Sequence, residues 1–430
     1  MNKKTVTLYS LSLWLTLGSS ITHALTPSER LGKSIFFDKN LSVNGNQSCA
    51  ACHTLEAGWT GPDSAINAAG AVYEGSVKGR FGNRKPPSSA YATFSPTLHY
   101  VIENDDPLFI GGNFWDGRAT GEKLGNPAAD QAQGPFLNPV EQALSGPAEV
   151  VSKVCTSSYA DLFKQVWGAD ACNPDKVDRA YEYIARSIAD FEASTESNAF
   201  TSKYDYYLKG KAKLTPKEKK GLKLFKGKAK CANCHPADPG PTGQPPLFTD
   251  FTYDNIGIPR NPDNPFYTQT EFNPEGMNWT DGGLGAFLAT RSDYQPFASD
   301  NLGKQKVPTL RNVDKRPYAK FIKAYGHNGY FKTLKGIVHF YNTRDVKPTC
   351  ADPFTTEADA LAQNCWPAPE VPANVNTQEV GNLHLTKAEE DAIVAFLKTL
   401  SDGYRPYPWK PRRTAYDASR HSDLGSKRRK

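Results

Sequence analysis

The sequence predicts a mainly α-helical protein built from two similar halves. Two observations carry this prediction. The segments 25–37 and 214–225 share a Leu-Thr-Pro start, an early Glu, a central Gly and an apolar end. A Cys-x-x-Cys-His motif follows each segment, at residues 49–53 and 231–235. A segment that recurs together with the motif behind it indicates a repeated structural unit.

Each repeated segment is predicted to form a helix. Thr26 and Thr215 are suited to cap the helix start, a proline follows at the first helical position, and a glutamate completes a capping box. Gly32 and Gly221 fall at the same position in the two helices. A glycine at this position predicts a close approach of another helix or of a bound group.

A second helix is predicted near the end of each half. Residues 174–196 carry apolar side chains at helical spacing, from Val177 to Ile188. Residues 386–400 begin with a Thr-x-x-Glu capping box and end before Gly403. Each of these two helices would close one of the repeated units.

Two stretches, 58–114 and 236–306, are rich in Gly, Pro, Asn and Asp. They predict long loops around the bound groups, with room for short hairpins. Loops of this length usually carry function.

The two Cys-x-x-Cys-His motifs predict two covalently attached c-type haems. In each motif two thiols form thioether bonds to the haem, and the histidine becomes the proximal iron ligand. The thiols belong to Cys49, Cys52, Cys231 and Cys234, and the imidazoles to His53 and His235. A zinc site would need further ligands nearby. Apart from His23 near the start of the chain, the nearest other histidines are His99 and His327, too far along the chain for a local zinc cluster.

The order of helix, loop and haem motif is the plan of a class I cytochrome c domain, and it occurs twice. The sequence therefore predicts a cytochrome c-like domain over residues 25–205 and another over 206–408, with the boundary between 197 and 210. A basic tail, 409–430, is predicted to be flexible.

The start of the chain reads as a signal peptide over residues 1–24. Lys3 and Lys4 form the basic region, an apolar stretch follows, and cleavage is expected after Ala24. The apolar stretch is short for a transmembrane helix, and no later segment is long and apolar enough. Export together with haem attachment predicts a periplasmic protein, with the cell surface as the alternative.

The remaining four cysteines fall into two close pairs. We expect the disulfides Cys155–Cys172 and Cys350–Cys365, because an oxidising compartment favours them. Each loop closure would contribute about 3 kcal/mol in the chain-entropy model. Free buried thiols are the alternative.

The formal net charge of +6 falls to +4 once the signal peptide is removed. Much of the excess lies in the tail, which we interpret as a solvated terminus. Docking to an acidic partner or an anionic surface is the alternative. No nucleic-acid-binding motif accompanies the basic residues.

Four further segments narrow the function: 112–118 (Gly-Asn-Phe-Trp-Asp-Gly-Arg), 131–141, 307–313 and 327–329. Together with the haem motifs, they resemble the bacterial di-haem cytochrome c peroxidase superfamily, which includes the MauG-type enzymes. The resemblance covers nearly the whole chain after the signal peptide. It implies a peroxide-reactive haem in the N-terminal domain and an electron-transferring haem in the C-terminal domain.

The resemblance also implies roles for four residues. Glu141 would be the distal acid–base that moves the peroxide proton, if burial raises its pKa. Gln131 would orient bound peroxide, and Pro135 would cap the distal face without offering a ligand. Trp115 would lie between the haems as an electron relay.

Axial ligands distinguish members of this superfamily. Standard members hold the first haem inactive with a second histidine soon after the motif, but here none occurs between His53 and His99. His99 lies beyond the expected position, so we predict an open sixth position on the first haem. For the second haem the pattern falls on Tyr341, the MauG-type ligand. The alternatives at this second site are His339, His327 and Met277.

Calcium often binds between the haems of these proteins. Here Lys85, Lys315 and Arg316 stand at the expected ligand positions, and their side chains cannot ligate Ca²⁺. Backbone carbonyls or waters could still hold an ion, so calcium stays open but is not favoured.

The resemblance implies an enzyme that reduces hydrogen peroxide. Electrons would come either from a small redox protein, as in an ordinary cytochrome c peroxidase, or from a side chain of a partner protein, as in MauG-type enzymes. Tyr341 and the missing histidine favour the second source. A non-enzymatic di-haem electron carrier and a structural module that uses haem only as a core are the remaining alternatives.

Overall fold

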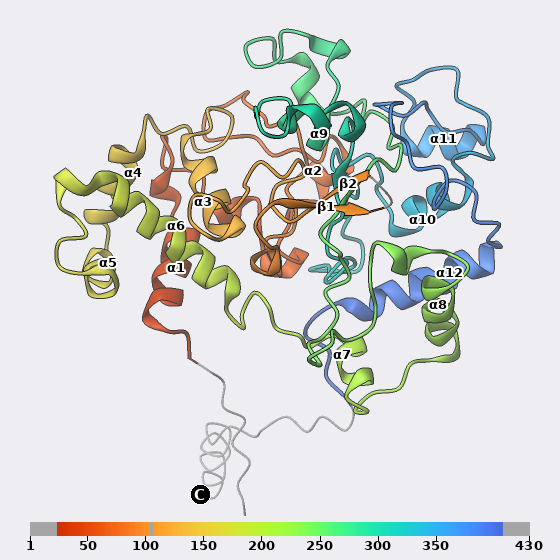
Figure 1. Cartoon of the computed structure of the whole chain (residues 1–430), viewed down its shortest axis with the longest axis horizontal. Helices are drawn as coiled ribbons and strands as arrows, with labels where there is room; N and C mark the ends of the chain where they lie inside the picture. The colour runs from red at the N-terminus through yellow and green to blue at the C-terminus, as the bar shows by residue number, and fades with distance from the viewer. Residues whose placement is uncertain (1–23, 104–105, 407–430) are drawn as a thin grey trace, which may run out of the picture.

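The computed structural model describes residues 24–103 and 106–406 and is mainly helical (Figure 1). The predicted signal peptide, apart from Ala24, and the basic tail lie outside the described residues.

Helices of the first half are α1 (Pro27–Phe37), α2 (Ser64–Ala68), α3 (Pro127–Leu137), α4 (Pro147–Cys155), α5 (Ala160–Trp167), α6 (Val177–Ala193) and α7 (Lys203–Leu208). Those of the second half are α8 (Pro216–Lys226), α9 (Gly283–Leu288), α10 (Leu334–Thr343), α11 (Glu357–Gln363) and α12 (Lys387–Leu397). The strands form two small antiparallel pairs, β1 (His99–Glu103) with β2 (Asp106–Ile110) and β3 (Tyr253–Asp254) with β4 (Gln305–Lys306).

The two halves repeat one helix crossing. Helix α1 packs on α6, and α8 packs on α12. A Cβ atom on Gly32 would collide with the carbonyl oxygen of Ser187 on α6, and one on Gly221 would collide with that of Ala392 on α12. The predicted close approach at these glycines is confirmed, and in both halves the neighbour is a helix.

Local signals set the helix ends as predicted. Capping boxes at Thr26, Thr215 and Thr386 start α1, α8 and α12. The predicted helix over 174–196 is confirmed in its centre. It begins with a 3₁₀ turn at Pro174–Lys176 and ends as α6 at Ala193, where Ser194 turns to extended backbone.

Each half has its own hydrophobic core. Residues of α1, α3, α4 and α6 form the first core, which lies on the left in Figure 1; those of α8, α10 and α12 form the second, on the right. A smaller hydrophobic cluster joins the halves. Leu98, directly before the β1–β2 hairpin, and Phe109, on β2, pack with Tyr253 and Leu284. The hairpin and α9 thus occupy parts of the two predicted long loops.

A buried ion pair links Arg311 of the second half to Asp205 on α7. Arg311 donates to both carboxylate oxygens of Asp205 at 2.8 and 3.1 Å, and both side chains are 1% exposed. The Arg311 guanidinium lies 4.9 Å from the ring centre of Tyr91 in the first half. It therefore contacts both halves of the chain.

Both predicted disulfides are present. Cys155, at the end of α4, pairs with Cys172 at a Cα separation of 5.8 Å. Cys350 pairs with Cys365 at 5.1 Å. Among the residues that the structure describes, no helix has the length and apolar character to cross a membrane.

Candidate active site

The first haem motif is held in a 3₁₀ turn, Cys49–Ala51, directly before His53. The Nδ1 atom of His53 lies 3.1 Å from the carbonyl oxygen of Trp59. As a donor to that carbonyl, Nδ1 leaves Nε2 free to ligate a metal. Burial lowers the pKa of His53 to about 4, so the imidazole is neutral at neutral pH, which is the ligating form.

The second motif repeats this arrangement in the turn Cys231–Asn233. The Nδ1 atom of His235 lies 2.7 Å from the carbonyl oxygen of Phe248. Burial also lowers the pKa of His235 to about 4. Burial raises the pKa of the Cys49 and Cys231 thiols to about 12.

Each motif opens into a cavity. The N-terminal cavity, of about 360 Å³, is lined by Cys49, Cys52, His53, Gln131, Pro135 and Glu141 among others. The C-terminal cavity, of about 220 Å³, is lined by Cys231, Cys234, His235 and Tyr341 among others. Trp115 lines both cavities.

Buried polar atoms without a protein partner line both cavities. Gln47 Oε1, Gln142 Oε1 and Ser89 Oγ lack a hydrogen-bond partner in the N-terminal cavity. Gln305 and His327 Nδ1 lack one in the C-terminal cavity. Buried polar groups are rarely left unpaired. Ser89 Oγ, Gln305 Nε2 and His327 Nδ1 can donate hydrogen bonds, so the cavities fit bound groups that carry acceptors such as the carboxylates of a haem.

Glu141 reaches the N-terminal cavity from a turn behind α3. Its backbone N–H donates to the carbonyl of Asn138 at 2.9 Å, and its carbonyl accepts from the N–H of Ser76 at 2.6 Å. Burial raises the pKa of Glu141, while the positive charge of Arg118 and a hydrogen bond from Asn138 oppose this rise. A raised pKa suits a group that both takes up and releases a proton.

Gln131 and Pro135 lie one turn apart on α3, so their side chains share a helix face. The side chain of Asn126 caps this helix by accepting from the N–H of Ala128 at 2.8 Å. Both Gln131 and Pro135 line the N-terminal cavity, as Glu141 does. The sequence reasoning thus named three residues that the fold brings together.

Sequence reasoning missed one further acid in this cavity. Glu192 of α6 also lines the N-terminal cavity and is 8% exposed. Burial raises its pKa to about 8. No local motif marks it, because it lies on a helix whose pattern only predicts a core face.

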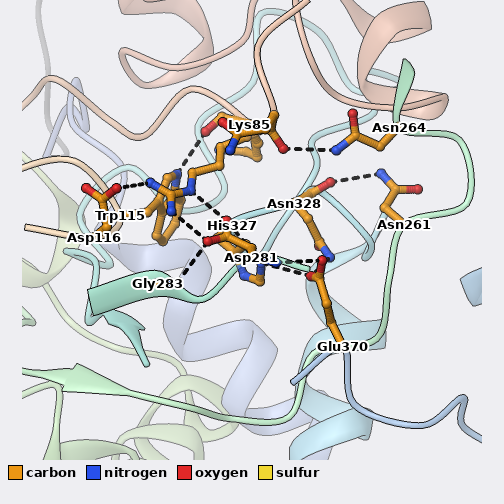
Figure 2. Close-up of polar contacts among 12 residues, drawn as sticks. Lys85, Trp115, Asp116, Asn261, Asn264, Asp281, Gly283, His327, Asn328 and Glu370 are labelled. Atoms are coloured by element: carbon orange, nitrogen blue, oxygen red, sulfur yellow. Dashed lines mark hydrogen bonds and ion pairs between the residues drawn. The ribbon is translucent and has the colours of Figure 1, made fainter. Parts of the chain in front are cut away.

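Trp115 is 8% exposed, and its indole N–H donates to the carbonyl of Lys85 at 2.9 Å. Arg84 donates to Asp116, which follows Trp115 in the sequence, and to both carboxylate oxygens of Asp281 at 2.6 Å. Figure 2 shows Lys85, Asp116 and Asp281 near the indole of Trp115. Asp116 belongs to the segment 112–118 that was named from the sequence. Its contact with Arg84, and that of Arg84 with Asp281, were not predicted, because these residues lie far apart in the sequence.

The four candidate ligands of the second site lie in different places. Tyr341 on α10 and the buried His327 line the C-terminal cavity. His339 is not among its lining residues and pairs with Glu390 at 2.8 Å. Met277 is 42% exposed and also lies outside it. Burial raises the pKa of Tyr341, so its phenolate would need a metal to stabilise it.

His99, the histidine next in sequence after His53, is exposed on β1 and lines neither cavity. In the described part of the chain, His53 is the one histidine that lines the N-terminal cavity.

Two buried lysines lie near the expected calcium position. The Lys85 amino group donates to Thr60 Oγ1 at 3.0 Å and to the carbonyl of Pro86 at 2.9 Å. The Lys323 amino group donates to three carbonyls, those of Ala57, Asn312 and Lys315, at 2.8, 2.7 and 3.3 Å. These three acceptors surround the amine, whose pKa burial and the nearby Lys85 lower well below its usual value. These amines hydrogen-bond to backbone carbonyl oxygens, which are the kind of ligand that Ca²⁺ prefers.

Comparisons with known proteins agree with this geometry. The family model for di-haem cytochrome c peroxidases matches residues 26–213. The chain is 34% identical to the methylamine utilization protein MauG of Paracoccus denitrificans over 374 residues, which cover 86% of this chain and 88% of that protein. It is 29% identical to the cytochrome c551 peroxidase of Nitrosomonas europaea over 322 residues, covering 73% and 74% of the two chains.

A solved structure is also similar. The diheme peroxidase BthA from Burkholderia thailandensis superposes with a TM-score of 0.68 at 29% identity, covering 88% of this chain and 87% of that one. Two haem motifs, two cavities and these relatives lead to one conclusion. The chain belongs to the di-haem cytochrome c peroxidase family and is a haem-dependent oxidoreductase of the cytochrome c peroxidase and MauG type.

Proposed function

We propose that this protein is an exported peroxidase in which the N-terminal cavity cleaves hydrogen peroxide and the C-terminal cavity supplies electrons. One observation carries the proposal: Trp115 lines both cavities, whereas Glu141 and Gln131 line the first and Tyr341 the second. The corresponding domains are residues 25–205 and 206–408, each with its own cytochrome c-like core.

Two covalent haems fit the two cavities. Cys49, Cys52 and His53 would hold one haem, and Cys231, Cys234 and His235 the other. When bound, the haem irons supply the redox chemistry by which peroxide is reduced.

Glu141 moves the proton. As a carboxylate it accepts a proton from one oxygen of hydrogen peroxide, and as an acid it returns that proton to the other oxygen, which leaves as water. Gln131, on the neighbouring helix, orients the peroxide by hydrogen bonding. Pro135 has neither a backbone N–H nor a ligand atom in its side chain, so it shields the cavity without competing for it.

Trp115 carries electrons between the cavities. Its ring is buried between them and its N–H is fixed by the Lys85 carbonyl at 2.9 Å. Tyr341 is the proposed second ligand of the C-terminal haem. A phenolate would favour the oxidised state of that haem and let it store one oxidising equivalent.

A side chain of a partner protein is the proposed final electron source. Three features support this: Tyr341 in the C-terminal cavity, the lack of a second histidine among the described residues lining the N-terminal cavity, and 34% identity to MauG. A small redox protein is the second candidate, supported by the similarity to the cytochrome c551 peroxidase. The predicted signal peptide and the two disulfides favour the periplasm as the location.

Stopped-flow absorbance of the fully ferric protein, mixed with stoichiometric hydrogen peroxide and no reductant, tests the proposal. We expect rapid oxidation in a first phase, followed by oxidation at the second haem and a long-lived product. A protein that reacts only after one haem has been reduced would refute the open N-terminal site. A protein that does not consume peroxide in either state would refute the peroxidase function.

A further inference from the structure

One segment of the second half carries a high density of positive charge. Residues 209–230 contain ten lysines and a single acidic residue, Glu218. All ten lysines are exposed, whereas Glu218 already pairs with Lys203 at 2.7 Å. The segment includes helix α8 and leads directly into the second haem motif, because Lys230 precedes Cys231.

Helix α8 has one buried side and one charged side. The buried side, with Gly221, Leu224 and Phe225, packs on α12. The other side carries four exposed lysines, which we call the lysine face: Lys219, Lys220, Lys223 and Lys226. Spacings of three and four residues connect them, so their side chains are neighbours along the helix. Figure 1 shows α8 at the edge of the second half, next to α12.

The equivalent helix of the first half shows that this fold does not require the lysines. Helix α1 has the same capping box and the same glycine at its crossing with a neighbouring helix. Where α8 carries Lys217 and Lys223, α1 carries Ser28 and Ser34. Like charges three or four residues apart destabilise a helix. Neither helix formation nor packing therefore explains the charge of α8.

Nearby acidic residues do not neutralise the lysine face. Lys226 pairs with the exposed Asp238 at one end of it. In the part of the chain that the structure describes, Lys219, Lys220 and Lys223 have no carboxylate at ion-pair distance. Three adjacent amines are thus available to the anionic groups of another molecule.

The same helix borders the C-terminal cavity. Phe225, on the buried side, lines this cavity, as do Ala229 and Lys230 in the turn that follows. Helix α8 also packs against the turn Cys231–Asn233 of the second haem motif. A helix with its side chains is about 10 Å across. Electrons that enter through the lysine face therefore have little more than the width of α8 to cross before they reach the C-terminal haem site.

We infer that the lysine face is the docking surface for the protein that donates electrons to the C-terminal haem, and that this donor presents an acidic surface. The inference rests on the proposed function and adds the chemical character of the partner. Opposite charges on two proteins steer their encounter and fix their orientation. An anionic lipid surface would also attract the lysines, but it has no electron to donate to the cavity that α8 borders.

Peroxide turnover with two small electron donors of opposite charge provides the test. Ferrocyanide is a tetraanion and hexaammineruthenium(II) is a dication. Two equivalents of either donor, with two protons, reduce one hydrogen peroxide to two waters. In the wild type, the rate with ferrocyanide should fall as salt is added and the rate with hexaammineruthenium(II) should rise, because salt screens charges beyond about 10 Å at 0.1 M.

Lys219→Glu/Lys223→Glu reverses two charges on the lysine face. At low ionic strength we expect turnover of ferrocyanide to fall on the order of fivefold to tenfold, and turnover of hexaammineruthenium(II) to rise. Lys219→Gln/Lys223→Gln removes the same charges without reversing them. It should give an intermediate fall, so the result does not depend on how well the reversed variant folds.

Lys39→Glu/Lys78→Glu is the matched control. It reverses two exposed lysines of the first half and changes the net charge by the same amount. Because these residues lie away from α8, turnover of ferrocyanide should stay within about twofold of wild type. An equal fall in this control and in Lys219→Glu/Lys223→Glu would overturn the inference, since net charge alone would then explain the rate.

Poly-L-glutamate serves as an acidic polypeptide that can occupy the lysine face. It should inhibit ferrocyanide turnover by the wild type, and inhibit Lys219→Glu/Lys223→Glu at least about tenfold more weakly. Both proteins keep the basic tail, so a difference in inhibition reports the lysine face. Equal inhibition of the two proteins, or unchanged ferrocyanide turnover in the variant, would overturn the inference.

Two further outcomes identify other errors. Inhibition of the wild type by phosphatidylglycerol vesicles but not by poly-L-glutamate would overturn the inference in favour of a lipid surface. A wild-type protein that does not react with peroxide in the absence of any donor would contradict the proposed function, because no docked partner takes part in that reaction.

Discussion

Replacing Glu141 with Gln keeps the size of the side chain and removes its proton transfer. The structure places this side chain in the N-terminal cavity beside Gln131 and Pro135, with a pKa raised by burial. A positioned acid–base typically contributes about 10²- to 10⁴-fold to a rate. We therefore expect peroxide cleavage to slow by that factor in Glu141→Gln.

The protonation state of Glu141 determines how the rate of peroxide cleavage depends on pH. Glu141 must be ionised to take the proton from peroxide, so the wild-type rate should rise as pH increases through its raised pKa and then level off. Glu141→Gln should lack this rise. The assay is the rate of the first absorbance phase after mixing with peroxide across a pH series.

Glu192→Gln is a matched control in the same cavity. Glu192 is also buried, with a pKa of about 8, but it lies on α6 rather than in the turn behind Gln131 and Pro135. This variant should keep the first phase within about threefold of wild type. If Glu192→Gln loses the rate and Glu141→Gln keeps it, the acid–base role belongs to Glu192 and our reasoning is wrong.

Four further predictions follow from the geometry. Trp115→Phe should slow oxidation of the second haem on the order of tenfold or more in stopped flow, with the first phase retained; an unchanged second phase would contradict the relay. Tyr341→Phe should change the ferric absorbance of one haem, whereas His339→Gln should not; the opposite result would make His339 the ligand. Arg311→Ala should leave the buried Asp205 carboxylate without its cationic partner and lower the free energy of unfolding by about 3–5 kcal/mol. In calorimetry we expect the thermal midpoint to fall by about 5–10 °C. A fall of less than about 2 °C would show that the ion pair is dispensable. The amines of Lys85 and Lys323 hydrogen-bond to the backbone oxygens near the expected calcium position, so we expect no dependence on calcium. Dialysis against a chelator should leave the rate of peroxide turnover within about twofold of the untreated protein. A loss of turnover that added Ca²⁺ restores would refute this prediction.

Sequence reasoning succeeded where the signal is local. Thr26, Thr215 and Thr386 start helices through capping boxes that span four residues, and the glycine of each repeat marks a helix crossing. The haem motifs and the disulfide pairs are also short-range patterns. These features fix the helical halves before any tertiary contact is known.

Prediction from the sequence failed where tertiary contacts bring distant residues together. Glu370 lies 43 residues from His327, and Arg84 lies 197 residues from Asp281, with no motif that links them. Glu192 belongs to a helix that reads only as core. The helix α3 was not predicted either, because its few apolar side chains and internal proline hide the helical period. Such residues become visible only once the fold has defined a cavity.

The Lys323 amine joins a carbonyl of the first half, at Ala57, to carbonyls of the second half, at Asn312 and Lys315. A bound ion in such a place would obey mass action, and its occupancy would follow the concentration of that ion in the surroundings. A side chain is present at a fixed effective concentration in every molecule. The contact between the two halves is therefore made by a side chain of the protein itself, and it does not vary with the ionic composition of the surroundings.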